Sequence, residues 1–280
     1  MDTSVGSSAR LGVYLYCLST PTCVEALRPG RPGAVLGVDE RYPVDVLERS
    51  GVAAVIGTID PADFTDENLQ ALAWLGPRAM RHDAIVQQVM DAGPVLPVKF
   101  GTIFGNAAAL ESLLAKHHDR IAGVLEELAG RAEWSVKAYA SDAAVRESVA
   151  ALDPEIQRRL AELSPAPGMR YLQRKQLEPL IDAAAQEWIA DRADGIQDEL
   201  AARAVASATL RCHSTRVTGR SDRMIMNSSY LLSSDAAAME DFQAAFEAQS
   251  HACTGYGVTL ELKGPWPPYN FCPPLPVADE

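Results

Sequence analysis

The second half of the chain has an order of strand and helix patterns that few folds accommodate. The predicted strands cover residues 133–139, 209–217, 224–232 and 258–263. Helical patterns over residues 141–163 and 170–208, the second interrupted near Gly195, lie between the first two strands. Another helix follows Asp235, a typical N-cap residue, and precedes the last strand. The resulting order, β–α–β–β–α–β, is that of the split βαβ or ferredoxin-like fold, with a helical extension after the first strand.

The first half begins with a continuously apolar run at residues 11–18, which predicts a strand buried on both faces. Further elements are predicted as strands at residues 34–38, 44–47 and 52–56, and as helices at residues 63–75 and 79–90. Residues 95–104 are apolar but contain Pro97, so they predict an edge strand or two short strands. Asn106 is expected to cap a helix whose apolar residues recur at the helical period. They are Leu110, Leu113, Leu114, Ile121, Leu125 and Leu128.

The length of the chain and the restart of its pattern predict two domains. A domain holds about 100–200 residues, and this chain has 280. Gly130 separates the leucine-rich helix from the strand pattern that follows, so we place the domains at residues 1–130 and 131–280. Both domains mix helices and strands, and the expected fold class is therefore α+β.

The charge balance of the chain excludes some classes of partner. It has 25 basic and 37 acidic residues, a formal net charge of −12. Such a chain repels phosphate backbones and anionic headgroups, so neither nucleic acid nor a membrane is an expected partner. No apolar run approaches the about 20 residues that a membrane-spanning helix requires. Five cysteines without a C-x-x-C spacing favour a reducing compartment, and we expect a cytoplasmic protein.

The sequence lacks the common motifs of catalysis. Residues 100–105 have the wrong glycine spacing for a phosphate-binding loop, and no lysine follows the second glycine. Gly255 and Gly257 precede a strand rather than the helix of a dinucleotide site, and no G-x-S-x-G is present. The five histidines lack metal-ligand spacing. We therefore predict no catalytic, cofactor-binding or metal-binding residues.

Two groups of residues leave alternatives open. His82 and Lys99 would form an enzyme site for a small molecule if both lined one pocket, where burial would lower the pKa of the lysine. A basic cluster, Arg170, Arg174 and Lys175, lies near the start of the long helix. These cations either meet an acidic partner or pair with carboxylates of their own helix, such as Glu178 and Asp182.

Residues 264–276 (GPWPPYNFCPPLP) form a proline-rich strap after the last strand. Its six prolines exclude helix and predict an extended, largely polyproline II course. Trp266, Tyr269 and Phe271 stand within six residues of one another. Such rings either close an intramolecular core or bind a partner protein. Packing is the favoured interpretation because the strap directly follows a strand.

Several segments together resemble the GvpL/GvpF family of gas vesicle proteins. Residues 262–271 (LKGPWPPYNF) are similar to the family's G-P-W-P-P-Y-x-F ending, and residues 95–104 (VLPVKFGTIF) to its V-L-P-[LV]-[RK]-F-G-T stretch. Residues 133–137 (EWSVK), His82 in its helix and residues 167–172 (PGMRYL) are similar to three further motifs. The matches run in order from Leu11 to Phe271, and only the polar leader and the last residues lie outside them.

The resemblance implies a non-enzymatic accessory protein for the assembly of gas vesicles, which are gas-filled protein shells. Its expected partners are the small hydrophobic shell protein (GvpA-like) and other accessory gas vesicle proteins, met during nucleation or growth. Its expected location is the cytoplasm, in association with gas vesicles, and no cofactor is implied. The implied fold is an N-terminal α+β domain of unusual topology and a ferredoxin-like C-terminal domain with extra helices.

The candidate partner-binding residues come from three places in the sequence. The apolar stretch with its proline predicts a surface or sheet edge that meets the shell protein, and the basic cluster and the strap supply the other candidates. They are Phe100, Phe104, Arg170, Arg174, Trp266 and Tyr269. Two alternatives stay open at this point: the small-molecule enzyme with His82 and Lys99, and a scaffold or chaperone outside gas vesicles.

Overall fold

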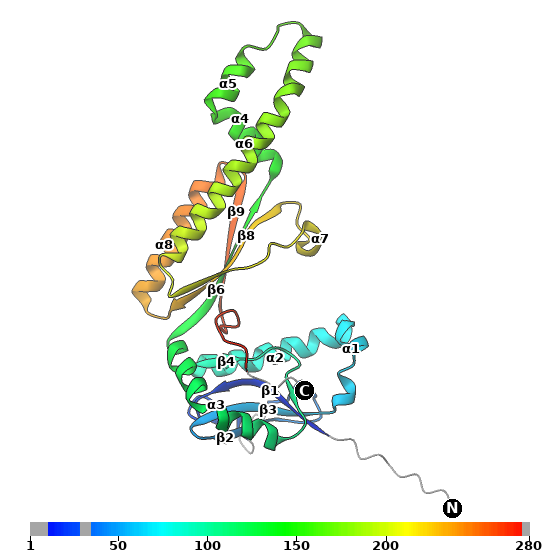
Figure 1. The fold of residues 1–280 in the computed structure, drawn as a ribbon, viewed down its shortest axis with the longest axis vertical. Helices are drawn as coiled ribbons and strands as arrows, with labels where there is room; N and C mark the ends of the chain where they lie inside the picture. The colour runs from blue at the N-terminus through cyan, green and yellow to red at the C-terminus, as the bar shows by residue number, and fades with distance from the viewer. Residues whose placement is uncertain (1–10, 29–34, 276–280) are drawn as a thin grey trace, which may run out of the picture. The chain divides into compact units, whose positions relative to one another are not determined.

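The computed structural model describes residues 11–28 and 35–275, which divide into two compact units (Figure 1). The first unit comprises Met1–Ala132 together with Trp266–Glu280, and the second comprises Glu133–Pro265. The chain thus leaves the first unit near Gly130 and returns to it after Pro265. The sequence assigned the strap to the C-terminal domain, whereas its described residues from Trp266 onward belong to the first unit.

The first unit is a sheet with a helix on each face. Its strands are β1 (Gly12–Ser19), β2 (Val44–Arg49), β3 (Val52–Ile59), β4 (Val95–Pro97) and β5 (Ile103–Phe104). Its helices are η1 (Glu25–Leu27), η2 (Pro61–Asp63), α1 (Asp66–Gln70), α2 (Leu72–Ala92) and α3 (Ala107–Leu128). The strand order is β2-β3-β1-β4, and β5 also pairs with β1. All these pairs are antiparallel.

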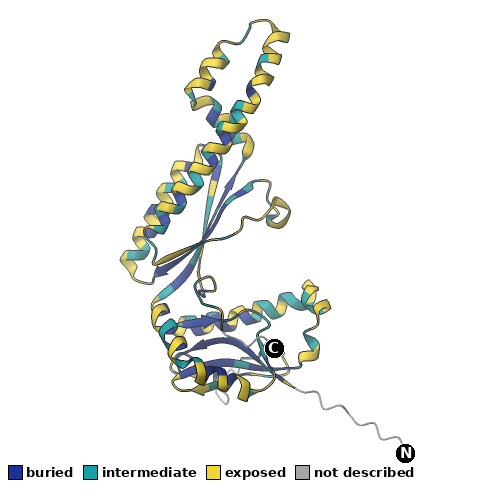
Figure 2. Cartoon of the chain, in the orientation of Figure 1, coloured by how far each residue is buried: buried dark blue, intermediate teal, exposed yellow. Residues whose placement is uncertain are grey.

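Strand β1 is buried on both faces, as its continuous apolar run predicts (Figure 2). Tyr14 and Tyr16 enter one buried cluster together with Ile85 and Val89 of α2. Leu15 and Leu18 enter the other, which contains Leu110 and Leu114 of α3. Successive residues of β1 do not alternate strictly between the two clusters, because a β-bulge lies between Leu15 and Cys17. The central strand thereby joins the two helical layers of the unit.

Three local expectations for the first unit are settled by the structure. Residues 95–104 form two short strands with Pro97 at the end of the first, one of the two forms predicted. Of the strand expected at residues 34–38, the described part forms only the isolated bridge between Leu36 and Pro43. The boundary expected between helices at residues 63–75 and 79–90 is wrong, because residues 66–70 form the short helix α1 and α2 runs from Leu72 to Ala92 through Pro77. The ring lies near the start of α2, where the missing N–H removes a single bond of the helix.

Helix α3 begins where its cap residue predicts. The Asn106 side chain accepts a hydrogen bond from the N–H of Ala109 at 2.9 Å, and the six apolar residues predicted for its inner face are all buried. Replacing Asn106 by alanine removes this acceptor, and we expect the free energy of unfolding to fall by about 1 kcal/mol. Urea denaturation measures the loss. Asn106→Asp keeps an acceptor and should stay within about 0.5 kcal/mol of the parent.

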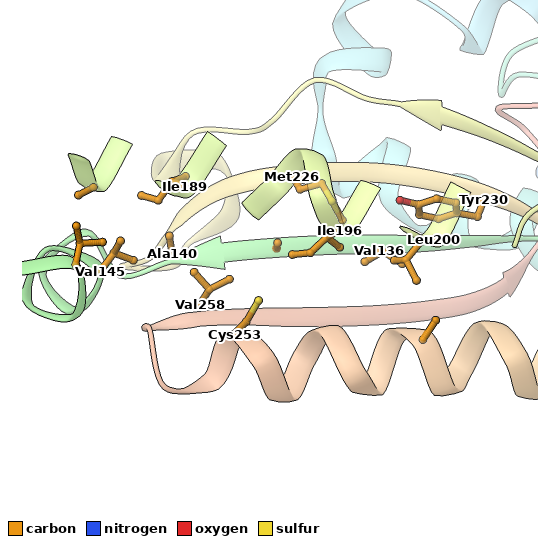
Figure 3. Packing of buried hydrophobic residues seen from close by; sticks show 14 of the residues in the cluster. Val136, Ala140, Val145, Ile189, Ile196, Leu200, Met226, Tyr230, Cys253 and Val258 are labelled. Carbon is orange, nitrogen blue, oxygen red and sulfur yellow. The ribbon is translucent and has the colours of Figure 1, made fainter. Parts of the chain in front are cut away.

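The second unit is a four-stranded sheet packed against helices (Figure 3). Its elements are β6 (Arg131–Ala140), α4 (Asp142–Leu152), α5 (Pro154–Ala161), α6 (Pro167–Ala201), β7 (Ala206–Thr209), α7 (Thr215–Thr218), β8 (Arg223–Ser233), α8 (Ala236–Thr254) and β9 (Val258–Trp266). The strand order is β7-β8-β6-β9. Helices α6 and α8 contact each other and β8, and their apolar side chains share one core with the strands. Val136, Ile196 and Tyr230 are examples.

The long helix α6 differs from its sequence prediction at both ends and in its middle. It continues without interruption through Gly195, because Ile189, Ile196 and Leu200 are buried in the core and offset the about 1 kcal/mol that an interior glycine costs. It ends at Ala201 rather than Ala208. The alanine-rich stretch that follows pairs with β8 as the strand β7, so sheet pairing overrides its helical propensity.

The segment between β7 and β8 also differs from the prediction of one strand over residues 209–217. Only Thr209 of that range belongs to β7, and residues 215–218 form the short helix α7. The last helix and strand agree with expectation. Asp235 caps α8 through two backbone N–H groups, those of Ala237 and Ala238.

Candidate partner-binding groove

Two segments that are far apart in the sequence line one groove of the first unit. The groove has a volume of about 180 Å³. One wall is Pro97, Val98, Lys99 and Thr102, and the other is Tyr269, Cys272, Pro273, Pro274 and Leu275. The first wall is the stretch between β4 and β5, and the second is the strap. We call this feature the strap groove.

The strap is anchored to the first unit by a turn, a hydrogen bond and apolar contacts. The N–H of Phe271 donates to the carbonyl of Pro268 at 3.1 Å. The strap therefore contains a turn, whereas the sequence predicted an extended backbone. The Tyr269 hydroxyl donates to a carboxylate oxygen of Asp83 at 3.1 Å. Cys272 and Leu275 pack against the core cluster between the sheet and α3. These contacts agree with the packing interpretation of the strap.

A buried relay of hydrogen bonds holds the other wall of the strap groove. Nε2 of His82 lies 3.2 Å from the carbonyl oxygen of Val98, and Nδ1 lies 2.9 Å from the Tyr14 hydroxyl. A carbonyl only accepts, so Nε2 carries the proton and Nδ1 accepts from the tyrosine. The tyrosine oxygen in turn accepts from the N–H of Gly101 at 3.1 Å. Helix α2 is thus connected through the central strand to both ends of the residue 98–101 segment.

The relay is neutral because it is buried. Burial lowers the pKa of His82, although the nearby Asp83 carboxylate raises it in part. Burial likewise raises the pKa of Tyr14, while the bond from Gly101 lowers it in part. Both shifts favour the uncharged side chains, which is the state that the hydrogen bonds require.

The turn between β4 and β5 directs Lys99 into solvent. The Thr102 hydroxyl donates to the carbonyl of Lys99 at 2.7 Å, and the N–H of Thr102 donates to the same oxygen at 3.2 Å. Gly101, with φ of +84°, supplies the left-handed residue that this turn needs. The Lys99 side chain is exposed on the rim of the strap groove.

The enzyme alternative fails on this geometry. It required His82 and Lys99 to converge in one pocket, but His82 is 1% exposed and inside the core, while Lys99 faces solvent. His82 contacts this segment only through the buried carbonyl of Val98, whereas the next residue, Lys99, is exposed.

The six candidate partner-binding residues fall in different environments. Phe104 is only 7% exposed and packs in the core, so it supports the fold and cannot offer an apolar surface. Phe100 is half-buried and meets the rings of Tyr14 and His82 edge-on. Trp266 and Tyr269 are 47% and 36% exposed on the strap. The remaining two, Arg170 and Arg174, are exposed on α6 in the second unit.

Sequence reasoning did not find several residues that shape the strap groove. Asp83 anchors the strap, Thr102 holds the turn, and Leu275 packs against the core cluster between the sheet and α3. Asp83 follows His82, and Thr102 belongs to the family-like stretch at residues 95–104, which was the available signal. Nothing in the spacing of Leu275 indicated its contact, because that contact joins segments distant in the sequence.

Three further properties concern metal ligands, membrane spans and cysteines in the part of the chain that the structure describes. Residues 11–28 and 35–275 contain no group of three or more side chains placed to hold a metal ion. Within the same residues, no helix combines the length and the apolar character needed to cross a membrane. All five cysteines lie in this part of the chain, and none of them forms a disulfide.

Comparison with known proteins shows the family of the chain. The model of the family described as "Gas vesicle synthesis protein GvpL/GvpF" matches residues 12–273, which include both walls of the groove up to Pro273. The chain belongs to the GvpL/GvpF family. This agrees with the resemblance that the sequence motifs indicated.

Members of the GvpL/GvpF family from distant microbes align with nearly the whole chain. Gas vesicle protein L of a Streptomyces species is 30% identical over 266 residues, covering 92% of this chain and 91% of that protein. Gas vesicle protein F of the same species is 29% identical, covering 93% and 99%. Gas vesicle protein L2 of Halobacterium salinarum is 29% identical, covering 94% and 92%. Similar identities to L and F proteins do not separate the two branches.

Solved GvpF structures share the mixed α/β fold. The crystal structure of gas vesicle protein GvpF from Anabaena sp. superimposes with a TM-score of 0.65 at 19% identity, covering 94% of this chain and 98% of that one. The GvpF structure from Microcystis aeruginosa gives a TM-score of 0.60, also at 19% identity, covering 93% and 98%. At this identity the likeness concerns the fold alone.

Proposed function

We propose that this chain is a non-enzymatic accessory protein of gas vesicle assembly that binds the hydrophobic shell protein at the strap groove, alongside other accessory gas vesicle proteins. The observation that supports the proposal most is the family match over residues 12–273. The family-like segment at residues 95–104 supplies one wall of the groove, and Tyr269 of the family-like segment at residues 262–271 lies on the other. The strand order β7-β8-β6-β9 further supports a ferredoxin-like second unit with a helical extension.

The chemistry of the strap groove suits an apolar segment of a partner. Pro97, Val98 and Leu275 give it apolar walls, and the prolines of the strap hold one wall without losing much chain entropy on binding. Strand β4 is the last strand on this side of the sheet path. Lys99 on the rim supplies one cation for a carboxylate or carbonyl of the bound segment.

The role in gas vesicles is tested by removing the gene in its own host. We expect cells without it to lose vesicles in phase-contrast and electron microscopy, and the parental gene to restore them. Normal vesicles in the deletion strain would contradict the proposed role and would favour the scaffold or chaperone outside gas vesicles.

The site is tested with the full chain. Lys99→Glu combined with Pro274→Asp places two carboxylates on exposed positions of the strap groove. We expect capture of purified shell protein to fall by about tenfold or more. Binding of an apolar segment would remove the two new carboxylates from water without giving them a partner, which costs free energy. Ala115→Asp combined with Lys116→Glu makes the same charge change on exposed positions of α3 and should leave capture unchanged. Equal capture by both pairs would move the contact away from the strap groove.

A further inference from the structure

The second unit carries an exposed basic and apolar tip at the start of α6. Arg170, Arg174 and Lys175 are exposed there, and none of them forms an ion pair within the described chain. No ion pair joins these cations to Glu178 or Asp182 among the described residues, and Asp182 pairs with Arg146 at 2.8 Å. Large apolar side chains lie beside the cations. Met169, Tyr171 and Leu172 are 53%, 65% and 55% exposed. We call residues 169–175 the tip (Figures 1 and 2).

The same unit contains a cavity of the opposite charge. Its volume is about 320 Å³, and it lies where the junction of α4 and α5 meets the middle of α6. Trp188 stacks on Tyr256 with ring centroids 5.0 Å apart, and Leu152, 61% exposed, is on the wall. Three carboxylates line the cavity. They belong to Asp153, Glu187 and Asp191.

This cavity suits the side chain of an arginine or lysine. Glu187 and Asp191 are exposed and form no ion pair among the residues that the structure describes, while Asp153 caps α5 through the N–H of Ile156 at 2.9 Å. Arg192 is the cation beside the rings, at 5.3 Å from the Trp188 centroid. An entering cation would lay its alkyl stem on the aromatic stack and its head against the carboxylates.

The tip of a chain cannot enter its own cavity. Both lie on α6, which is continuous from Pro167 to Ala201. At 1.5 Å per residue, Arg174 is about 21 Å along the axis from Trp188. Arg170 and Trp188 are 18 residues apart, which is about five full turns, so they lie on the same side of the helix. Two antiparallel copies of α6 therefore bring each tip to the other's cavity at once.

We propose that two copies of this chain form a reciprocal dimer in which the tip of each copy docks into the acidic aromatic cavity of the other. A second copy is the partner that fits, because the basic tip and the acidic cavity are complementary in charge and both lie on α6. The contact would also cover the exposed apolar residues of the tip. A two-fold contact of this kind forms twice, which suits the commonest symmetry of homo-oligomers. The proposal does not depend on the strap groove or on the role in gas vesicles.

Charge reversal with purified full-length chains tests the dimer by sedimentation velocity. We expect the parent to dimerise at about 50 mM salt and to bind about tenfold or more weakly at about 500 mM. The charge of the tip is reversed by Arg170→Glu with Arg174→Glu. The charge of the cavity is reversed by Glu187→Lys with Asp191→Lys. Each pair alone should weaken dimerisation about a hundredfold or more. An equimolar mixture of the two variants should form dimers again, because each tip then meets a cavity of opposite charge.

The control reverses two other exposed arginines of the same unit. Arg211→Glu with Arg216→Glu changes the net charge as the tip variant does, on the segment around α7, and should leave dimerisation as in the parent. A parent that stays monomeric at about 100 µM and low salt would overturn the proposal. So would a parent dimer that both reversals leave intact, which would place the interface elsewhere. A mixture that stays monomeric would equally exclude the second copy as the occupant of the cavity.

Discussion

Replacing Gly257 by alanine will lower the free energy of unfolding of the second unit by about 2–5 kcal/mol. Gly257 has a φ of +75°, and a Cβ atom there would stand 2.4 Å from the Cβ of Ala144 on α4. Its carbonyl accepts the N–H of Ser141 at 2.9 Å, the residue that caps α4. The substitution therefore combines an unfavourable backbone conformation with a collision against α4, and a shift of α4 away from residue 257 would break the bond between Ser141 and Gly257.

A neighbouring glycine provides the control for this prediction. Gly255 ends α8 with a φ of −71°, and nothing lies within 4 Å of the position of its added Cβ. Gly255→Ala should change the free energy of unfolding by no more than about 0.5 kcal/mol. Thermal and urea unfolding, followed by circular dichroism, measure both variants. Equal stabilities of the two variants would mean that residue 257, just before β9, lies farther from Ala144 of α4 than the structure shows.

Replacing His82 by leucine will cost the first unit about 2–6 kcal/mol. The change leaves the carbonyl of Val98 and the O–H of Tyr14 without their partners, in a place where the histidine is only 1% exposed. Two buried polar groups without partners each cost about 1–3 kcal/mol. The strap groove should loosen as well, because residue 98 forms part of its wall. Urea unfolding measures the stability, and hydrogen exchange of residues 98–101 measures the loosening.

The same histidine gives the first unit a defined dependence on pH. Burial lowers the pKa of His82 in the folded protein below its usual 6.5. Below about pH 6.5 the unfolded chain therefore binds more protons than the folded one, and the free energy of unfolding falls as the pH falls. The slope contributed by this one group is at most about 1.4 kcal/mol per pH unit, and it ends at the folded pKa.

A glutamine variant separates this slope from that of the other groups. His82→Gln removes the titration, so its stability between about pH 6.5 and 5 should fall less steeply than that of the parent. If His82→Gln and the parent lose stability in parallel on acidification, the buried histidine is not the proton-linked group.

The elements that could be predicted from sequence are those decided by local interactions. The cap at Asn106, the buried face of α3 and the cap at Asp235 depend on residues within a few turns of one another, and the structure confirms them. The errors occur where a distant partner changes the outcome. Residues 206–208 are alanine, serine and alanine and were predicted as helix, yet they pair with β8.

The candidate site was predictable only in parts. The motifs around Val98 and Tyr269 could be identified from their unusual residues, but their meeting in one groove joins segments at the two ends of the first unit. The same limitation applied to Phe104. An apolar residue next to a proline is equally consistent with a surface edge and a core position, and burial at 7% exposure decides for the core.

The sequence by itself determined that this chain belongs with the GvpL/GvpF proteins, that it mixes helices and strands, and where most of them begin. These properties follow from composition, periodicity and short motifs, which act over a few residues. Only the tertiary structure decided that the strap returns to the first unit, that His82 is a neutral core residue, and that the basic tip of α6 has no carboxylate partner within its own described chain. Each of these outcomes depends on which groups distant in the sequence lie close in space. The free energy of a polar or charged side chain is set mainly by its burial and by its partners, and less by the residues next to it in the sequence.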